Sequence, residues 1–579
     1  MAVPQRGTTP AAMSDAFQWD TARDRLAAQP EGRVNIAYQT VDRHVAEGRG
    51  ERAAVLWLGR NQQRRLLSYA DLFELSTRAA GALRALGIGA GEVVATLLPR
   101  VPELFVTALG AWKAGAVFCP LYTSLGPGPI KARLQLSGAT TLITTDAYYA
   151  RRIAAIRARL PALKTVLLVG DHAGEREDCG DFGALLAEVD PESVEMAPTV
   201  AGDPACLHFT SGTTGIAKGV FTGHGAVLSQ LVSGEQVFGL KPDDVLWCTG
   251  NPGWITWTAY GMVAPLATGC MTVADESDFD PHHWYGVLHA EKVSVWYTTP
   301  TAIRMLMRHG AALARSYPAN CLRIAASVGE PLNAEAVAWG EKALGVPFLD
   351  TWWQTELGAI AVANLPFASR AGSMGRPLPG VEVTVGRRVT GGFEPVTGLD
   401  QPGELAIRTG MPSMFTGYLG DPARFGASFF DTWYLSGDLV RRDADGYLWF
   451  VGRSDDMIVS GAQSIGPFEV ESTLMDHPAV AEIGLVGKPD MLKREVPVAF
   501  AAVNPGFEAG DALRVELLAF ARQQLGPQLA PEEIYFVDTL PKTATGKILR
   551  RALRMWAACE AGEDDLPPLR PAPGRFDEG

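Results

Sequence analysis

Residues 207–219 read Leu-His-Phe-Thr-Ser-Gly-Thr-Thr-Gly-Ile-Ala-Lys-Gly. Within this stretch, Ser211 to Gly219 hold three glycines, three hydroxyl side chains and one lysine. Glycines let backbone N–H groups turn toward a ligand, hydroxyls add donors, and Lys218 adds a positive charge. The spacing is not that of a Walker loop, which needs G-x-x-x-x-G-K-[ST]. A flexible surface loop is the alternative, but the lysine after TSGTTG favours a loop that binds a polyphosphate.

The composition indicates a large globular protein. Its 579 residues exceed the size of a single core, and this length predicts about three to five domains or subdomains. The hydrophobic share of 47% and the charged share of 20% are ordinary for such a chain. The net charge of −13 argues against nucleic-acid binding, which needs a basic face. The protein must therefore bind an anionic substrate through positive charge close to the site, and not through its overall charge.

Cysteine usage and the termini predict the compartment. The seven cysteines are dispersed without a C-x-x-C pair, which argues against a zinc site and fits a reducing cytosol. The N-terminus has no apolar core typical of a secretory signal, and no run of 18 apolar residues predicts a membrane helix. We therefore expect a cytoplasmic protein that does not bind a membrane.

Strand-like and helix-like segments alternate before Gly372. Val93–Leu98 predicts a buried strand, and the helical spacing of Leu104, Ala108 and Ala111 predicts the helix after it. This alternation predicts parallel sheets covered on both faces. The same pattern recurs from residues 141–144, 165–169, 293–297 and 323–326.

The pattern changes after Gly372. From there to about residue 450, Gly and Pro turns separate short alternating segments, which predicts a small antiparallel β-subdomain. From 457 to about 556 the strand–helix alternation returns at a smaller scale, which predicts a separate domain of about 100 residues. We therefore expect an N-terminal domain at 16–453, a C-terminal domain at 454–560, and disordered ends at 1–15 and 561–579.

The phosphate-binding segment resembles that of the adenylate-forming enzymes, which include acyl-CoA synthetases, luciferases and peptide-synthetase adenylation domains. Five further segments fit this family in order and spacing, and the chain most resembles the shorter, bacterial type of acetyl-CoA synthetase. The resemblance implies two doubly wound αβα subdomains, a small β-barrel-like subdomain and a smaller, mobile α+β C-terminal domain. It implies a phosphate-binding role for Thr210, Ser211, Gly212, Thr213, Thr214, Gly215 and Lys218.

Two segments resemble the family's nucleotide and acyl site. Ser327-Val-Gly-Glu-Pro331 follows a predicted strand, where a glycine lets a ligand approach the backbone; taken alone, Gly-Glu-Pro is typical of a turn. Asp350-Thr-Trp-Trp-Gln-Thr-Glu356 is more specific, because polar groups beside two tryptophans are costly to bury without partners. A tryptophan pair in the core is the alternative.

The resemblance assigns roles to both segments. Trp353 would close the acyl pocket and leave no room for a long chain, and Glu356 would be catalytic as well as a magnesium ligand. The adenylate would lie among Gly329, Glu330, Pro331, Asp350, Thr351, Trp352 and Gln354, the magnesium ion on Thr355 and Glu356, and the acyl group against Ile255, Thr256, Val328 and Trp353.

Three further sites lie toward the C-terminus. Asp438 ends a tight turn and resembles the carboxylate that accepts both ribose hydroxyls, a role that suits its two oxygens. Arg453 resembles a second ribose contact, and Asp455 resembles the hinge of the C-terminal domain. Alone, Asp438 would be an exposed turn residue and the charged cluster around Asp455 a solvated linker.

Lysine 547 lies in Pro541-Lys-Thr-Ala-Thr-Gly-Lys547, where glycine and hydroxyl residues flank it on a turn. Such a lysine can reach into a cleft and offset phosphate charge, although a basic run is more often a solvated patch. By resemblance Lys547 is the catalytic lysine of adenylation and a target of a lysine acetyltransferase and deacetylase. Arg522 resembles a contact to the 3′-phosphate of coenzyme A, with Arg151 and Arg152 as weaker candidates.

The chain departs from the family at several positions. Ala462, Gln463 and Ser464 replace a Gly-His-Arg sequence, and Ser464 stands where the arginine would meet the adenylate phosphate. The loss of that charge-assisted contact is worth about 1.5–3 kcal/mol. Trp257 replaces a glycine and is expected to narrow the site or redirect coenzyme A. Leu357 and Ala217 are milder replacements.

The function that the resemblance implies is ATP-dependent ligation of a short carboxylic acid, most of all acetate, to coenzyme A. The reaction would pass through an acyl-adenylate and use ATP, Mg²⁺ and coenzyme A. One alternative is an enzyme that loads a carrier protein, which Arg522 disfavours because a carrier-bound arm has no 3′-phosphate. Another is a nucleotide-binding paralogue with impaired catalysis, for which residues 461–464 are the only support.

Overall fold

The computed structural model describes residues 17–171, 173–211, 217–460, 463–491, 493–543 and 547–558. The predicted disordered ends, Gly212 to Gly215 and Ala462 lie outside these residues. The described chain divides into two compact units. The first comprises residues up to Thr384 with Ala406–Ser436 and Asp445–Leu448; the second comprises Val385–Leu405, Gly437–Ala444 and the described residues from Trp449 on. The predicted domain boundary at residue 454 and the hinge at Asp455 stay predictions.

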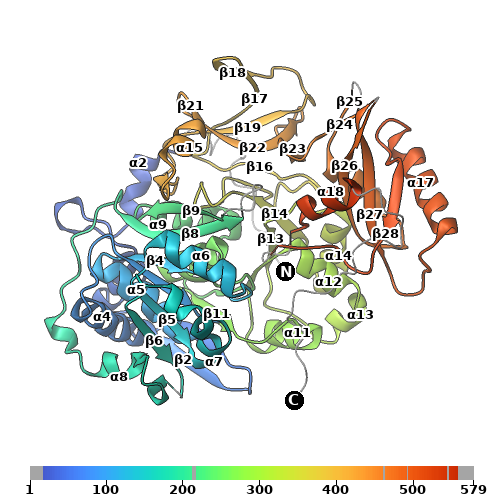
Figure 1. Ribbon diagram of the computed structural model, residues 1–579. Helices are drawn as coiled ribbons and strands as arrows, with labels where there is room; N and C mark the ends of the chain where they lie inside the picture. Colours follow the sequence, from blue (N-terminus) through green and yellow to red (C-terminus); the bar gives the residue numbers. More distant parts are fainter. Residues whose placement is uncertain are drawn as a thin grey trace. The chain divides into compact units, whose positions relative to one another are not determined.

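The first unit contains an eight-stranded sheet, whose strands β3 to β9 Figure 1 shows in blue to green. Its central strands run parallel, with Val94 opposite both Phe118 and Thr141. The pairs β8–β9 and β20–β9 are antiparallel. The order is β20 (Gly417–Tyr418), β9 (Ala217–Gly223), β8 (Pro204–Ser211), β4 (Val117–Pro120), β3 (Val93–Leu97), β5 (Thr141–Thr145), β6 (Thr165–Val169) and β7 (Gly180–Asp181).

Helices cover both faces of this sheet. On one face, α6 (Pro127–Ser137), η4 (Tyr149–Ile153) and η5 (Ala154–Arg159) pack apolar side chains against Ala95, Leu97 and Leu142. On the other, Trp112 of α5 (Pro102–Ala114) contacts Phe118 edge-on, with ring centroids 5.9 Å apart, a spacing typical of aromatic pairs. Proline opens α5 and a left-handed glycine, Gly115, ends it, as helix termini favour.

A nine-stranded sheet forms the second half of the first unit. Strands β1 and β10 to β14 run parallel to one another, whereas β2, β15 and β16 are added antiparallel at the edges. The order is β16 (Arg376–Pro377), β15 (Val362–Ala363), β14 (Phe348–Trp352), β13 (Ile324–Val328), β12 (Val295–Thr298), β10 (Val245–Cys248), β11 (Met271–Asp275), β1 (Ala53–Leu58) and β2 (Arg64–Ser68).

One face of this sheet carries a tryptophan-rich core. Trp247 and Trp296 lie parallel, with centroids 6.1 Å apart, and Trp284 meets both edge-on. The helices on this face are α11 (Pro281–Ala290), α12 (Pro300–Met307), α13 (Gly310–Arg315) and α14 (Ala334–Leu344). Other helices of this unit are α2 (Trp19–Ala22), α3 (Arg43–Ala46), α4 (Tyr69–Ala85), α7 (Asp146–Tyr148), α8 (Phe182–Ala187), α9 (Ala226–Ser233), η8 (Gly234–Phe238), η9 (Trp257–Val263), α10 (Ala264–Thr268) and α15 (Pro422–Ala427).

Two smaller sheets follow. A six-stranded sheet has the order β18 (Gly392–Pro395), β17 (Val383–Val389), β19 (Gly403–Arg408), β22 (Trp433–Arg442) and β21 (Phe429–Phe430), with β23 (Leu448–Arg453) paired to β22. The last sheet has the order β25 (Gln463–Ile465), β24 (Ile458–Ser460), β27 (Arg494–Val503) and β26 (Val480–Asp490), with β28 (Glu533–Phe536) parallel to β27.

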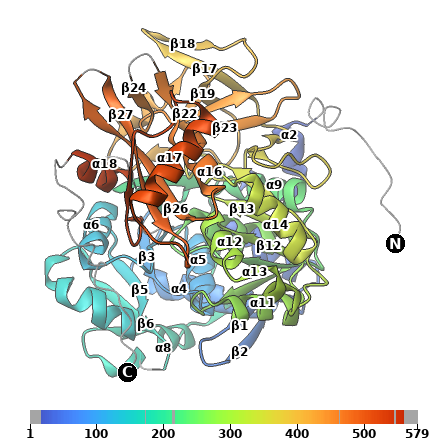
Figure 2. The ribbon, with the colours of Figure 1, turned by 90° about the vertical axis from the view of Figure 1, so that its right-hand side faces the viewer.

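Alternation along β27 builds the core of the C-terminal part. Ala499 and Ala501 face α16 (Pro467–Met475) and α17 (Asp511–Leu525), which Figure 2 shows on the near side of this sheet. Val498 and Phe500 face α18 (Arg550–Ala558). Successive strand residues point to opposite faces, so one strand serves two helical layers. No helix of the described residues is long and apolar enough to cross a membrane.

Candidate active site

The phosphate-binding segment is the connection of a β-hairpin. Strands β8 and β9 pair antiparallel, which sets Thr210 opposite Lys218 and Ser211 opposite Ala217. Gly219 is packed closely, because a Cβ there would lie 2.9 Å from side-chain atoms of Leu207 and Leu419. The hairpin therefore fixes both ends of the predicted phosphate loop, while Gly212, Thr213, Thr214 and Gly215 themselves lie outside the described residues.

Asp350 anchors the turn that follows β13. Its carboxyl group accepts hydrogen bonds from Ser327 Oγ at 3.0 Å, from the backbone N–H of Leu332 at 3.3 Å and from that of Thr351 at 3.1 Å. Only 5% of Asp350 is exposed, and burial raises the pKa of its carboxyl group to about 7. In this structure the Asp350 side chain thus holds the predicted nucleotide-binding turn by accepting hydrogen bonds from backbone N–H groups.

Gly329 and Glu330 in that turn have different partners. Gly329 has a φ of +96°, and a Cβ there would lie 2.6 Å from the indole of Trp254, so glycine is required for both conformation and space. Glu330 accepts from Thr301 Oγ1 at 2.7 Å and pairs with Arg304 at 2.5 Å. Its carboxylate is therefore held by α12, which the sequence analysis did not foresee.

Trp353 is fixed by a chain of hydrogen bonds. Thr351 Oγ1 donates to the carbonyl of Ser327 at 2.7 Å, and the Tyr297 hydroxyl lies 2.7 Å from Thr351 Oγ1. Because the threonine proton is already used, Tyr297 donates to Thr351. The indole N–H of Trp353 then donates to the Tyr297 oxygen at 3.2 Å. Tyr260 meets the Trp353 ring edge-on at 5.4 Å.

The other predicted pocket residues are buried near this edge of the sheet. Ile255, Thr256 and Val328 are all buried, and Thr256 Oγ1 has no hydrogen-bond partner among the described residues. Trp257 packs edge-on against Phe105, with ring centroids 5.1 Å apart. These are core contacts between η9 and α5, and they account for the large side chain at this position.

Residues after Trp353 are tied to a distant part of the same unit. Gln354 accepts from the Tyr434 hydroxyl at 2.8 Å and donates to the carbonyl of Ser436 at 3.0 Å. Glu356 Oε1 accepts from the Tyr418 hydroxyl at 2.8 Å. The segment from Trp352 to Glu356 is half-buried at most positions, so it is anchored and still reachable by a ligand.

The donor set at Thr355 and Glu356 fits magnesium. This ion takes oxygen ligands and usually combines one or two carboxylates with water and substrate phosphates. Glu356 offers one half-buried carboxylate, and Thr355 beside it offers a hydroxyl. The described residues contain no group of three or more His, Cys, Asp or Glu side chains that could hold a metal ion.

The second unit holds the predicted ribose contacts. Arg453 Nη1 donates to Asp438 Oδ1 at 2.9 Å, and its Nε lies 3.3 Å from Asp455 Oδ1. Although burial opposes its charge, the carboxylates of Asp438 and Asp455 raise the pKa of Arg453. The structure thus joins three residues that the sequence separates by up to seventeen positions, and Asp438 is buried by the contact.

Lys547, Arg522 and Ser464 also lie in the second unit. Lys547 is exposed. Its backbone carbonyl accepts a hydrogen bond from the Thr543 N–H at 2.7 Å, and its own N–H donates to Thr543 Oγ1 at 3.2 Å. Arg522 is exposed in the last turn of α17. The backbone of Ser464 in β25 pairs with Val459 in β24, and the side chain of Ser464 lies outside the described residues.

The weaker candidates for coenzyme A have structural partners. Arg152 donates to the carbonyls of Thr123 and Leu125, and its guanidinium lies 4.9 Å from the Tyr148 ring centroid. Arg152 therefore holds the connection after β4, whereas Arg151 is exposed.

Arg100 anchors the backbone just before the predicted acyl wall, and the sequence analysis did not single it out. Its guanidinium donates to the carbonyl oxygens of Thr249 at 3.0 Å, Gly250 at 3.1 Å and Asp275 at 2.7 Å. It joins the end of β3 to the ends of β10 and β11, just before the 253–256 segment. Its place directly after a predicted strand was the available signal, because ligands bind outside the carboxyl ends of parallel strands.

The two parallel-stranded sheets and the separate C-terminal sheet agree with the family comparisons. The AMP-binding enzyme family matches residues 42–419, and the AMP-binding enzyme C-terminal domain matches residues 469–547. The chain therefore belongs to the AMP-binding enzyme family, which confirms the resemblance to adenylate-forming enzymes.

Individual relatives cover almost the whole chain. Acetyl-coenzyme A synthetase of Bacillus subtilis (strain 168) is 38% identical over 543 residues and covers 93% of each chain. The solved acyl-CoA synthetase of Brucella canis is 34% identical, with a TM-score of 0.73 over 94% of this chain and 98% of the other. The anthranilate CoA ligase AuaEII, solved in complex with anthranoyl-AMP, is 26% identical, with a TM-score of 0.83 over 93% and 99%. The predicted fold class is therefore confirmed.

Proposed function

We propose that this protein is an AMP-forming acid–CoA ligase whose preferred substrate is acetate. The observation that carries the proposal is the fixed position of Trp353, whose indole is hydrogen bonded to Tyr297 and only 8% exposed. A rigid ring at the carboxyl edge of β14 leaves little room for a long acyl chain. Similarity to acetyl-CoA synthetases over nearly the whole chain supports the same substrate class.

The first half-reaction joins the acid to the nucleotide. The acid carboxylate attacks the α-phosphorus of ATP, an acyl-adenylate forms, and pyrophosphate leaves. Lys218 and the hydroxyls of its loop offset charge on the pyrophosphate, and Lys547 contacts the acid and the α-phosphate. Magnesium, held by Thr355 and Glu356 when bound, would offset phosphate charge. Such catalysis needs no side-chain nucleophile, because it depends on positioning and electrostatics.

The second half-reaction transfers the acyl group. The coenzyme A thiol attacks the acyl carbonyl and AMP leaves, while Arg522 meets the 3′-phosphate. The C-terminal domain turns about Asp455 between the steps, so that Lys547 withdraws and residues 457–466 approach the acyl-adenylate. One site then serves both reactions through domain closure.

Other nucleotide contacts complete the proposal. Asp438 and Arg453 bind the ribose, while Gly329 to Pro331 and Asp350 to Gln354 surround the rest of the adenylate. We place the protein in the cytoplasm, where a lysine acetyltransferase and deacetylase would act on Lys547, which is exposed in this structure.

The test is pyrophosphate release from ATP and acetate, measured with and without coenzyme A. The proposal expects acid-dependent release that becomes catalytic only when coenzyme A is added. No acid-dependent turnover with any acid from C2 to C6 would contradict it and favour the impaired paralogue. Turnover that requires a carrier protein in place of coenzyme A would favour carrier loading.

A further inference from the structure

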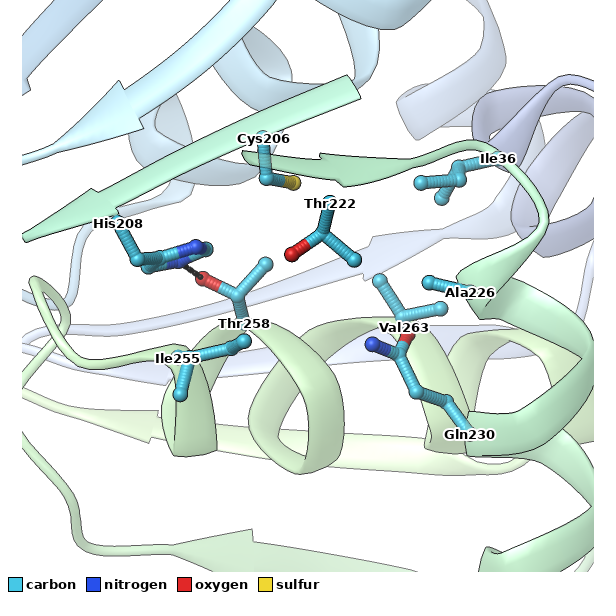
Figure 3. A pocket seen from close by; sticks show the side chains of 9 residues that line it. All are labelled: Ile36, Cys206, His208, Thr222, Ala226, Gln230, Ile255, Thr258 and Val263. Carbon is cyan, nitrogen blue, oxygen red and sulfur yellow. Dashed lines mark hydrogen bonds between the residues drawn. The ribbon is translucent and has the colours of Figure 1, made fainter. Parts of the chain in front are cut away.

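A small cavity, lined by both apolar and polar side chains, lies within the first unit, between strands β8 and β9 and helices α9 and η9. Its volume is about 10 Å³, enough for one water molecule. Figure 3 shows side chains from the strands, His208 and Thr222, facing Thr258 and Gln230 from the helices. Ile255, a predicted wall of the acyl pocket, also lines the cavity.

Three polar atoms around this cavity lack partners among the described residues: Nδ1 of His208, Oγ1 of Thr222 and Oε1 of Gln230. The side chains are otherwise fixed. His208 Nε2 lies 3.0 Å from Thr258 Oγ1, and Gln230 Nε2 donates to the carbonyl of Gly358 at 2.9 Å. Buried polar atoms left without a partner are costly, and in native proteins they are nearly always satisfied by protein or water.

The hydrogen-bonding capacity of one water molecule matches these three atoms. When His208 Nε2 carries the proton and donates to Thr258, the water donates to His208 Nδ1 and Gln230 Oε1 and accepts from Thr222. In the other tautomer, Nδ1–H donates to the water, which then donates to Thr222 and Gln230. In both arrangements one water molecule would have three hydrogen-bond partners, which is the usual number for a buried water.

The cavity joins two functional segments. His208 lies on β8 two residues before Thr210, where the strand enters the phosphate loop. Thr258 lies on η9 two residues after Thr256 of the predicted acyl wall. We propose that the cavity binds one internal water and that His208, through this water and Thr258, is a positioning residue that holds the phosphate-loop strand against the acyl-wall helix. The link to the acid rests on the proposed function.

The environment of His208 keeps its imidazole ring uncharged. The side chain is 2% exposed, and burial lowers the pKa of its imidazole to about 3. The ring therefore stays neutral at ordinary pH and keeps the acceptor or donor that the water needs.

The test combines a crystal structure with binding and kinetics of His208→Leu, His208→Gln, Thr222→Val and Thr258→Val. The wild-type structure is expected to show one ordered water bonded to His208, Thr222 and Gln230, and Thr222→Val to lose it. His208→Leu is expected to weaken AMP binding and raise the KM for acetate by about 3- to 10-fold, the equivalent of one hydrogen bond. His208→Gln, which keeps a donor and an acceptor, is expected to recover most of this loss, and His208→Leu with Thr258→Val to be no worse than either alone.

Tyr69→Phe is the matched control, since it removes a buried hydroxyl that bonds to the Leu266 and Cys270 carbonyls. It is expected to lower Tm without changing AMP binding or KM. A dry wild-type cavity would overturn the water site. Unchanged AMP affinity and KM in a folded His208→Leu protein would overturn the positioning role. Failure of the proposed function is distinct, because the wild type would then bind AMP yet release no pyrophosphate with acid.

Discussion

The phenol oxygen of Tyr297 accepts the indole N–H of Trp353 at 3.2 Å, and through Thr351 it connects this indole to the carbonyl of Ser327. Tyr297 lies on β12, Ser327 on β13 and Thr351 on β14, so three adjacent strands set the position of one ring. The Trp353 ring, which we propose as the floor of the acyl pocket, is therefore held in place by this edge of the sheet.

Removing the Tyr297 hydroxyl is expected to loosen this floor. Tyr297→Phe leaves the Trp353 N–H without its acceptor, which costs about 1–3 kcal/mol of stability for a buried group. A mobile Trp353 should also raise activity on C4 and C5 acids relative to acetate. Denaturant titration and an acid panel check both effects. Tyr285→Phe is the control, because the Tyr285 hydroxyl is buried without a partner in the described chain.

Arg100 is expected to affect the acid more than the nucleotide. Arg100→Met removes three hydrogen bonds to the carbonyls of Thr249, Gly250 and Asp275, so the segment that leads to Ile255 loses its anchor. We expect the KM for acetate to rise about 10-fold or more, as small misplacements near a reacting centre do, with AMP affinity nearly unchanged. Arg408→Met, which breaks an exposed pair with Glu382 and contacts with Thr432 and Trp433, should change neither quantity. Equal effects of the two variants would contradict the role of Arg100.

Asp350 predicts a pH dependence of stability. Burial raises its pKa from an ordinary value of 3.8 to about 7, so the folded protein retains a proton that the unfolded chain loses. Stability from this group is fully present below pH 4 and is lost as pH rises toward 7, with a slope of up to about 1.4 kcal/mol per pH unit. Asp350→Asn should remove that slope. Denaturant titrations from pH 4.5 to 8 check it, and parallel curves for both proteins would rule out the shift.

Lys547 is expected to serve only the first half-reaction. Lys547→Gln should slow acyl-adenylate formation by about 100-fold or more, as loss of one electrostatic stabiliser does. Thioester formation from supplied acetyl-adenylate should persist. Lys542→Gln is the matched control on the same turn, where Lys542 pairs with Glu482 at 2.7 Å. Equal loss of both half-reactions would show that Lys547 has a structural role instead.

Much of the fold could be predicted because hydrophobic periodicity is local. The predicted strand at 165–169 matches β6, and the predicted strand at 141–144 lies within β5 (Thr141–Thr145). Strand ends were less predictable: residues 293–297 were expected as a strand, but β12 runs from Val295 to Thr298. Backbone pairing with β10 and β13 decides those ends, and it depends on chain far away in sequence.

The candidate site was predictable only where chemistry is concentrated in one segment. Residues 350–356 carry such a motif. Tyr297 and Tyr260 do not, because each lies in an apolar run that reads as core, and packing alone brings them to Trp353. No pattern in the sequence indicates that Arg304 is the partner of Glu330 either. Pair contacts between separate elements cannot be inferred from one sequence without a structure.

The most direct test of a short-acid ligase is AMP formation by wild type and Trp353→Gly across straight-chain acids from C2 to C6, with coenzyme A present. We expect the wild type to prefer acetate, with activity that declines steeply beyond propionate, and Trp353→Gly to lose activity on acetate and gain it on C4 to C6 acids. The same chain-length profile for both proteins would contradict the claim that Trp353 closes the acyl pocket.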